Sequence, residues 1–242
     1  MSIGGYGIRC ASVAVDRRRR RGYRGRMRIR IGHELVFEVP RPTAILLMLY
    51  AHPDATATLE EPERLAVEPA LPVEDFVDWF GNRAGRLIAP AGTLRLRYDN
   101  VARDGGQPEP VIDWVHDNVT FGYQYSRPTK TAFDVFTERQ GVCRDFQHLA
   151  ITFLRALNVP ARYATGYLGD IGVPRDPNPM DFSAWLEVYL GGAWYTLDAR
   201  HNEPRIGRVL MGRGRDAVDV ALTTSFGPTT LTKFTVWTEL AS

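Results

Sequence analysis

Cysteine is scarce in this chain of 242 residues, which contains only Cys10 and Cys143. Two widely separated cysteines do not form the disulfide framework of a small secreted domain, so we expect a reducing compartment and a cytoplasmic location. A long apolar run is also lacking. The run from Ala44 to Tyr50 is far shorter than the roughly 20 residues that cross a bilayer. Because the arginines at 17–21 are followed by more arginine, the start does not resemble a secretory signal.

Clustered metal ligands are absent as well. No group of cysteines and histidines has the spacing of a zinc site, and the acids between Gly169 and Asp181 do not follow the calcium-binding loop pattern. We therefore predict no metal and no other cofactor. Hydrophobic residues make up 44% of the sequence, enough to bury a core in one large domain or two small ones.

Positive charge is concentrated at the beginning of the chain. The net charge is +2, yet the first 30 residues carry ten arginines and a single acid, Asp16, so the remainder is acidic. We predict that residues 1–26 form a basic, disordered extension. The run Arg17 to Arg21 would allow a weak, nonspecific contact with nucleic acid or an anionic membrane.

The first folded part is predicted to be a small β-rich domain at residues 27–104. Met27 to Glu38 alternates apolar and polar residues, which is typical of a half-buried strand, and Ala44 to Tyr50 reads as a second, fully buried one. Proline and glycine separate several further short apolar segments, a spacing typical of a β-sandwich. Those segments are Glu63 to Val67, Phe76 to Phe80, Arg86 to Ile88 and Leu94 to Tyr98.

A second domain is predicted at residues 108–242. Its first half has a short helix at Val111 to Val119, extended chain at Thr120 to Tyr125 and a long helix from Cys143. Its second half is predicted to be an antiparallel sheet, which makes the fold class α+β. The expected strands are Ala161 to Tyr167, Phe182 to Leu190, Ala193 to Ala199, Arg208 to Met211, Val218 to Thr223 and Thr232 to Trp237.

Cys143 stands where the long helix begins. Apolar residues recur after it at three- and four-residue intervals, and Asn158 and Pro160 end the pattern. These residues are Phe146, Leu149, Ala150, Phe153, Leu154 and Leu157. The positive end of a helix dipole lowers the pKa of a cysteine thiol, which favours the nucleophilic thiolate. A buried cysteine is otherwise an ordinary small apolar residue.

The Gly191-Gly192 pair predicts a two-residue hairpin turn. This register places Trp185 opposite Asp198, with Ser183 diagonal to Asp198 on the same face of the sheet. A cysteine at a helix start that faces a base and a carboxylate on adjacent strands is the geometry of nucleophilic catalysis. The pattern supplies a carboxylate, Asp198, but no base.

Several separated motifs resemble the core of bacterial transglutaminase-like proteins over residues 108–242, and the β-rich segment resembles the small domain that precedes this core. The resemblance implies a papain-like fold with a Cys-His-Asp triad that acts on protein or peptide amides through a thioester. The nucleophile then corresponds to Cys143, the orienting acid to Asp198, and the histidine position to Ser183. The motifs are Gly141 to Leu149, Pro160 to Tyr163, Gly166, Tyr167, Ala184, Trp185, Tyr195, Asp198 and Ala199.

Ser183 changes the expected chemistry, because a hydroxyl does not accept a proton near neutral pH. We therefore predict an impaired acyltransferase or peptidase. In an alternative, another histidine serves as the base. However, His148 lies about 140° around the helix from Cys143, and His201 would face away if its strand persists. His116, His33 and His52 belong to other segments. In a third hypothesis, a non-catalytic peptide-binding domain is tethered to nucleic acid or a membrane by the arginine tail.

Overall fold

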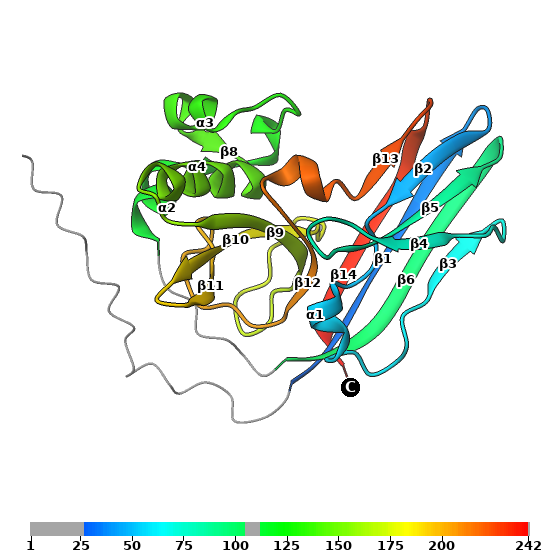
Figure 1. Ribbon diagram of the computed structural model, residues 1–242, viewed down its shortest axis with the longest axis horizontal. Coiled ribbons are helices and arrows are strands. Elements are labelled where there is room, and N and C mark those ends of the chain that lie inside the picture. The colour runs from blue at the N-terminus through cyan, green and yellow to red at the C-terminus, as the bar shows by residue number, and fades with distance from the viewer. Residues whose placement is uncertain (1–26, 105–111, 242) are drawn as a thin grey trace, which may run out of the picture.

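The computed structural model describes residues 27–104 and 112–241. The predicted basic extension at residues 1–26, with Arg17 to Arg21, lies outside this part of the chain. Figure 1 shows two units side by side, a β-sandwich and a mixed unit in which helices cover a sheet. Within the described residues, no helix is long and apolar enough to cross a membrane.

The sandwich consists of two four-stranded sheets, with strand orders β14-β1-β6-β3 and β13-β2-β5-β4. Inward-facing residues of both sheets, among them Leu35, Leu47 and Leu96, form its core, as expected when alternate side chains of each sheet face the other. The strands are β1 (Met27–Val39), β2 (Thr43–Leu47), β3 (Leu65–Glu68), β4 (Glu74–Val77), β5 (Arg83–Ala89), β6 (Gly92–Asp104), β13 (Thr223–Ser225) and β14 (Thr230–Leu240).

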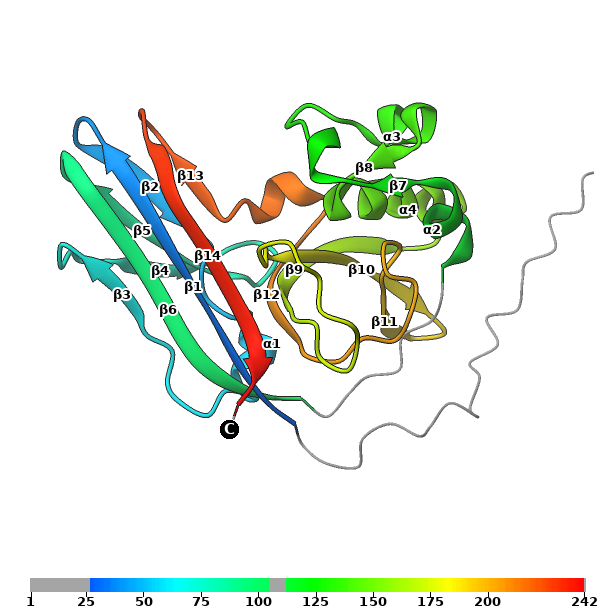
Figure 2. The same ribbon diagram turned by 180° about the vertical axis from the view of Figure 1, so that it is seen from behind.

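The end of the chain returns to the sandwich. β13 pairs with β2, and β14 pairs with β1 over almost its whole length, so the first and last described strands lie side by side in Figure 2. Both strands fall inside the range 108–242 that the sequence predicts as the second domain. This pairing was not predicted, because it depends on contacts about 200 residues apart in the sequence. The predicted strand at Val218 to Thr223 is wrong in its first part, where Ala217–Val220 forms a 3-10 turn.

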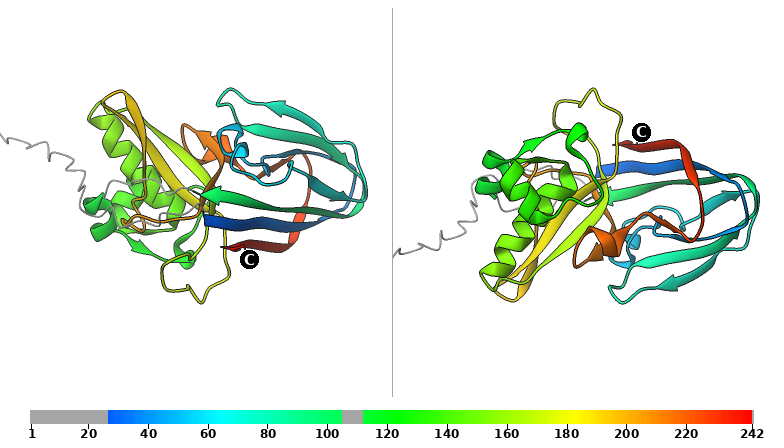
Figure 3. Two further views of the ribbon diagram at one scale, coloured as in Figure 1. Left: turned by 90° about the horizontal axis from the view of Figure 1, so that it is seen from below. Right: turned by 90° about the horizontal axis from the view of Figure 1, so that it is seen from above.

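The second unit is built on the sheet β11-β10-β9-β12. Helix α4 packs on it through Phe146, Leu149 and Ala150, and both views of Figure 3 show the helices gathered on this side. α4 ends before Asn158, which has a left-handed backbone with φ 57°. The remaining elements are α1 (Pro53–Thr56), α2 (Asp113–Asn118), β7 (Thr120–Phe121), α3 (Ala132–Glu138), β8 (Gln140–Gly141), α4 (Cys143–Ala156), β9 (Ala161–Leu168), β10 (Ser183–Leu190), β11 (Ala193–Leu197) and β12 (Arg208–Gly214).

The predicted hairpin is confirmed. Gly191 and Gly192 both have positive φ angles, 56° and 89°, which glycine adopts without a steric cost. Tyr189 pairs with Trp194, and Leu186 pairs with Leu197. Continued by one residue, this register brings Trp185 opposite Asp198, as the sequence predicts.

A buried aromatic cluster joins the two units. His33 of β1 stacks on Tyr98, and its Nδ1 lies 2.8 Å from the Tyr167 hydroxyl on β9. Phe182 packs edge-on against His33 from the segment that leads into β10. Burial lowers the pKa of His33 to about 3, so this imidazole is neutral at physiological pH. The cluster fixes the start of β10 against the sandwich and thereby positions the wall of the cavity described next.

Candidate active site

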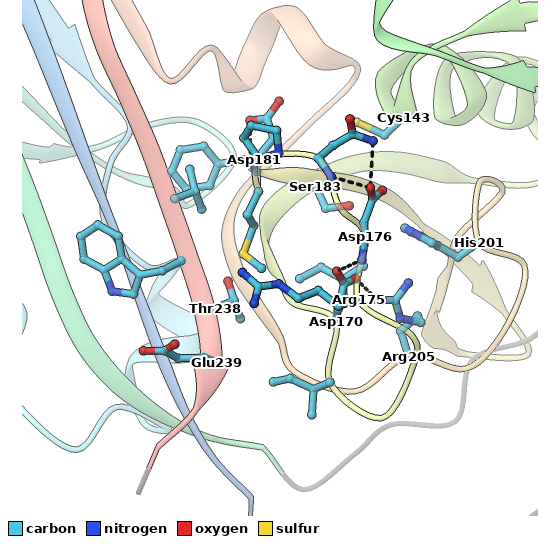
Figure 4. Close-up of a pocket in the computed structure, with 18 of the residues that line it drawn as sticks. Cys143, Asp170, Arg175, Asp176, Asp181, Ser183, His201, Arg205, Thr238 and Glu239 are labelled. Atoms are coloured by element: carbon cyan, nitrogen blue, oxygen red, sulfur yellow. Dashed lines mark hydrogen bonds and ion pairs between the residues drawn. The ribbon is translucent and has the colours of Figure 1, made fainter.

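Cys143 lines a cavity of about 780 Å³ between the two units. Figure 4 shows Cys143 at one side of this cavity, with Ser183 nearby and the β14 residues Thr238 and Glu239 across from them. The cysteine is the first residue of α4 and is partly exposed. A molecule in the cavity can therefore contact Cys143.

The helix start that carries Cys143 is held by polar contacts. The Asp145 carboxylate accepts a hydrogen bond from the Val142 amide at 2.9 Å and an ion pair from Arg144 at 3.0 Å. Asp145 is completely buried. A Cβ atom at residue 141 would lie 2.6 Å from the Cβ of Asp145, so this close approach requires Gly141. These contacts explain why Gly141, Arg144 and Asp145 accompany the cysteine.

The thiol of Cys143 does not have the lowered pKa that the helix start predicts. Burial raises the pKa of Cys143 to about 11, the Arg200 charge and the Arg144 amide lower it, and the charges of Asp181 and Asp198 raise it. Removal of water from around the sulfur disfavours the charged thiolate, and this cost exceeds the benefit of the helix dipole. At neutral pH the sulfur is therefore protonated.

Asp198 lies just beyond the end of β11 and is almost completely buried. Its carboxylate accepts hydrogen bonds from His201 Nδ1 and Arg208, both at 2.8 Å, and from the Arg200 and His201 amides. Burial by itself would raise the pKa of Asp198, but the hydrogen bond from His201 and the charge of Arg208 outweigh it and hold the pKa well below its usual range. Asp198 is an anion behind the cavity, and His201 lies between it and the cavity.

Ser183 is the first residue of β10 and pairs with Gly166 of β9. It is 7% exposed and lines the cavity together with Cys143. Among the described residues its hydroxyl oxygen has no hydrogen-bond partner. Nearly all buried polar groups are paired in proteins, so an unpaired hydroxyl beside the cysteine needs an explanation.

The histidines differ from one another in their surroundings. His148 is turned away from Cys143 as predicted, and its Nε2 accepts a hydrogen bond from the Ala217 amide at 3.3 Å. His116 contacts the Arg200 carbonyl. The expectation that His201 faces away is wrong. β11 ends at Leu197, and the turn that follows brings His201 back onto Asp198, with its ring toward the cavity in Figure 4.

Gln147 also belongs to this site, although the sequence did not single it out. This side chain is completely buried one helical turn after Cys143. Its Nε2 donates to the Ala184 carbonyl and to Asp198, both at 3.2 Å, and its Oε1 accepts from the Ala199 amide at 3.3 Å. Gln147 thus connects the cysteine helix to the start of β10 and to the segment that follows β11. The available signal was a polar residue at the i+4 position, which shares a helix face with Cys143.

We expect Gln147→Leu to lower the free energy of unfolding by about 1–3 kcal/mol, because it leaves buried backbone groups and Asp198 without these partners. Urea denaturation measures this loss. The matched control is Gln124→Leu on an exposed residue, which should stay within about 0.5 kcal/mol of the parent. Equal stability of the two variants would contradict the connecting role of Gln147.

The rest of the cavity wall is strongly charged. The irregular segment between β9 and β10 contributes Asp170, Arg175, Asp176 and Asp181. Arg205 holds Asp170 at 3.1 Å. Consecutive residues 236–240 of β14 form the opposite wall. Within residues 27–104 and 112–241, no three potential metal ligands come together.

Comparison with known proteins shows which family and which solved structure this chain resembles. Residues 99–199 match the family described as "Transglutaminase-like superfamily". A crystal structure described as that of "a Putative Cysteine Protease from Cytophaga hutchinsonii" superposes with a TM-score of 0.75 and 27% sequence identity, covering 90% of this chain and 92% of that one. The predicted α+β fold with a transglutaminase-like core is confirmed by these matches.

Two mycobacterial relatives are uncharacterized proteins. One from Mycobacterium leprae is 33% identical over 94 residues, which are 38% of this chain and 33% of the relative. One from Mycobacterium tuberculosis is 34% identical over 96 residues, which are 36% of this chain and 31% of the relative. The matched segment therefore spans about a third of the length of these curated relatives.

Proposed function

We propose that this protein, whose residues 99–199 form a transglutaminase-like core, is an amide-directed cysteine protein with an impaired chemical step. It binds a peptide amide in the cavity beside Cys143. The observation that carries the proposal is Ser183, a buried hydroxyl without a partner at the position where the resemblance places a histidine. Ser183→His tests it, because the variant should gain amide hydrolysis or acyl transfer.

The remaining parts of the site fit acyl chemistry. Cys143 can attack an amide carbonyl only as a thiolate, and the thioester forms when a protonated base donates its proton to the departing amine. The first backbone amides of α4 point toward the N-terminal end of the helix, where they can stabilise the oxyanion. A hydroxyl at residue 183 performs neither proton transfer. Substrate binding is therefore retained in this proposal, whereas turnover is slow.

A second candidate is an active cysteine peptidase or acyltransferase in which His201 is the base. The hydrogen bond from its Nδ1 to Asp198 favours this candidate, because the orienting carboxylate of a catalytic triad holds its imidazole in this way. The charges that act on the Cys143 pKa include those of Arg200, Asp181 and Asp198. The two candidates differ in whether His201 shares a proton with the sulfur.

The pH dependence of Cys143 alkylation separates them. In a Cys10→Ser background, the rate of iodoacetamide modification should rise about tenfold per pH unit from neutral pH, because the thiolate fraction grows until the pH reaches the raised pKa of about 11. His201→Gln should leave this profile unchanged. A rapid phase that persists below pH 7 and disappears in His201→Gln would refute the impaired site and establish the second candidate.

A further inference from the structure

The unpaired Ser183 hydroxyl is part of a small polar recess beside Cys143. Asp181 and Ser183 are two positions apart, and Phe182 between them points into the aromatic cluster with His33. Asp181 and Ser183 both line the cavity that reaches Cys143. We call this pair, with the sulfur of Cys143, the Asp181-Ser183 recess.

The recess contains a carboxylate without an ion-pair partner among the described residues. The Asp181 side chain accepts one hydrogen bond, from the Phe182 amide at 2.6 Å. Burial raises the pKa of Asp181, and this amide and the charge of Arg200 lower it. Arg200 is placed over the Phe121 ring at 3.6 Å, and its charge also acts on Asp176 and Tyr123. The single positive charge of Arg200 therefore acts on the carboxylates of Asp176 and Asp181 and on the Cys143 thiol.

These features fit a ligand that accepts one proton and then carries a positive charge. We propose that the Asp181-Ser183 recess binds an uncharged nitrogen base of the imidazole class, which is brought by the substrate or by a second ligand and replaces the missing histidine. The inference rests on the proposed function. Ser183 Oγ accepts a hydrogen bond from the N–H group of the base, and Asp181 stabilises the cation that forms.

In the proposed reaction the bound base moves protons between the Cys143 thiol, the departing amine and water. The nitrogen lone pair takes the proton of the Cys143 thiol, and the resulting thiolate attacks the amide carbonyl to form a C–S bond. As the C–N bond breaks, the protonated base returns its proton to the departing amine. Water then attacks the thioester, the base takes one proton from that water, the C–S bond breaks, and the thiolate regains the proton. No oxidant or metal is required.

Imidazole itself is the probe. In the Cys10→Ser background at constant neutral pH and ionic strength, added imidazole should accelerate the alkylation of Cys143 by iodoacetamide. The acceleration should saturate, because a bound base forms an ion pair with the thiol, and should reach about 10²-fold, the lower end of what a positioned base contributes. This readout does not depend on amide turnover.

Three variants locate the effect. Asp181→Asn and Ser183→Ala should each lower the plateau or require more imidazole to reach it, whereas Asp117→Asn, an exposed residue of α2, should behave like the parent. Unchanged urea midpoints show that the variants are folded. A linear, unsaturated dependence on imidazole that is equal in the parent and in Asp181→Asn, or no acceleration at all, would overturn the inference.

The outcome is separable from that of the proposed function. If Ser183→His gains amide turnover but imidazole has no effect on the parent, the amide-directed site stands and the recess is not a base-binding site. If imidazole accelerates alkylation but Ser183→His gains no turnover, the recess stands and the amide-directed function fails. In Ser183→His the imidazole effect should disappear, because the new side chain occupies the recess.

Discussion

Ser183→His is expected to increase turnover of a peptide amide by about 10²- to 10⁴-fold, the range that a positioned general acid-base contributes. The residue lines the same cavity as Cys143, so an imidazole at this position would share that cavity wall with the thiol. Its imidazole would take the thiol proton and form an ion pair, which reverses the effect of burial on the Cys143 pKa. The Cys143 alkylation profile should move to lower pH together with the gain in turnover.

Two control variants test whether the gain in turnover requires both the new imidazole and the Cys143 thiol. Ser183→Ala removes the hydroxyl without supplying a base and should not gain turnover, and Cys143→Ala combined with Ser183→His should be inactive. Enlarging a nearly buried residue can cost about 1–3 kcal/mol, so urea denaturation must show that Ser183→His is folded. A folded variant with no gain in turnover and an unchanged alkylation profile would refute the proposal that a missing base limits this site.

Asp198→Asn should lower the free energy of unfolding by about 3–5 kcal/mol, the loss that follows removal of one partner from a buried ion pair. Asp198 is almost completely buried and accepts hydrogen bonds from Arg208 and His201 at 2.8 Å. An amide at this position removes the buried negative charge that faces the Arg208 guanidinium, whose side chain is 10% exposed. Glu74→Gln, which breaks an exposed ion pair with Arg86, should have little effect on the unfolding midpoint.

Acid denaturation tests the same carboxylate. The pKa of Asp198 is lower in the folded protein than in the unfolded chain, so its contribution to stability is present above the unfolded pKa of about 4 and is lost as the pH falls below that value. The stability of Asp198→Asn should therefore decrease less between neutral pH and about pH 3 than that of the parent. Identical acid dependence in both proteins would show that Asp198 is not a buried anion.

Local patterns in the sequence were sufficient for much of the site. The helix that begins at Cys143 follows from apolar spacing and from the stop at Asn158, and the hairpin register follows from the two glycines at its turn. Both are short-range properties, since side-chain period and turn geometry depend on neighbouring residues. The register placed Ser183 and Asp198 on one face of the sheet, and the resemblance to transglutaminase-like proteins gave the two positions their expected roles.

Contacts between distant segments decided the rest. β14 pairs with the otherwise open edge of β1. The local sequence pattern predicts a strand there but does not predict its partner. His201 reaches Asp198 because β11 ends at Leu197, two residues before the predicted strand end at Ala199. Gln147 became part of the site through groups on the facing hairpin.

The sequence by itself therefore led to the prediction that the Cys143 thiol is the nucleophile, and it shows that position 183 has no histidine. Only the tertiary structure decided the protonation of the thiol. The helix dipole can be inferred from the position of Cys143 in the chain, but desolvation depends on everything that packs around the sulfur, and here it raises the thiol pKa to about 11. The cavity that is lined by Cys143, Ser183 and Asp181 also depends on the tertiary structure, because its walls come from two units that meet only when the chain is folded.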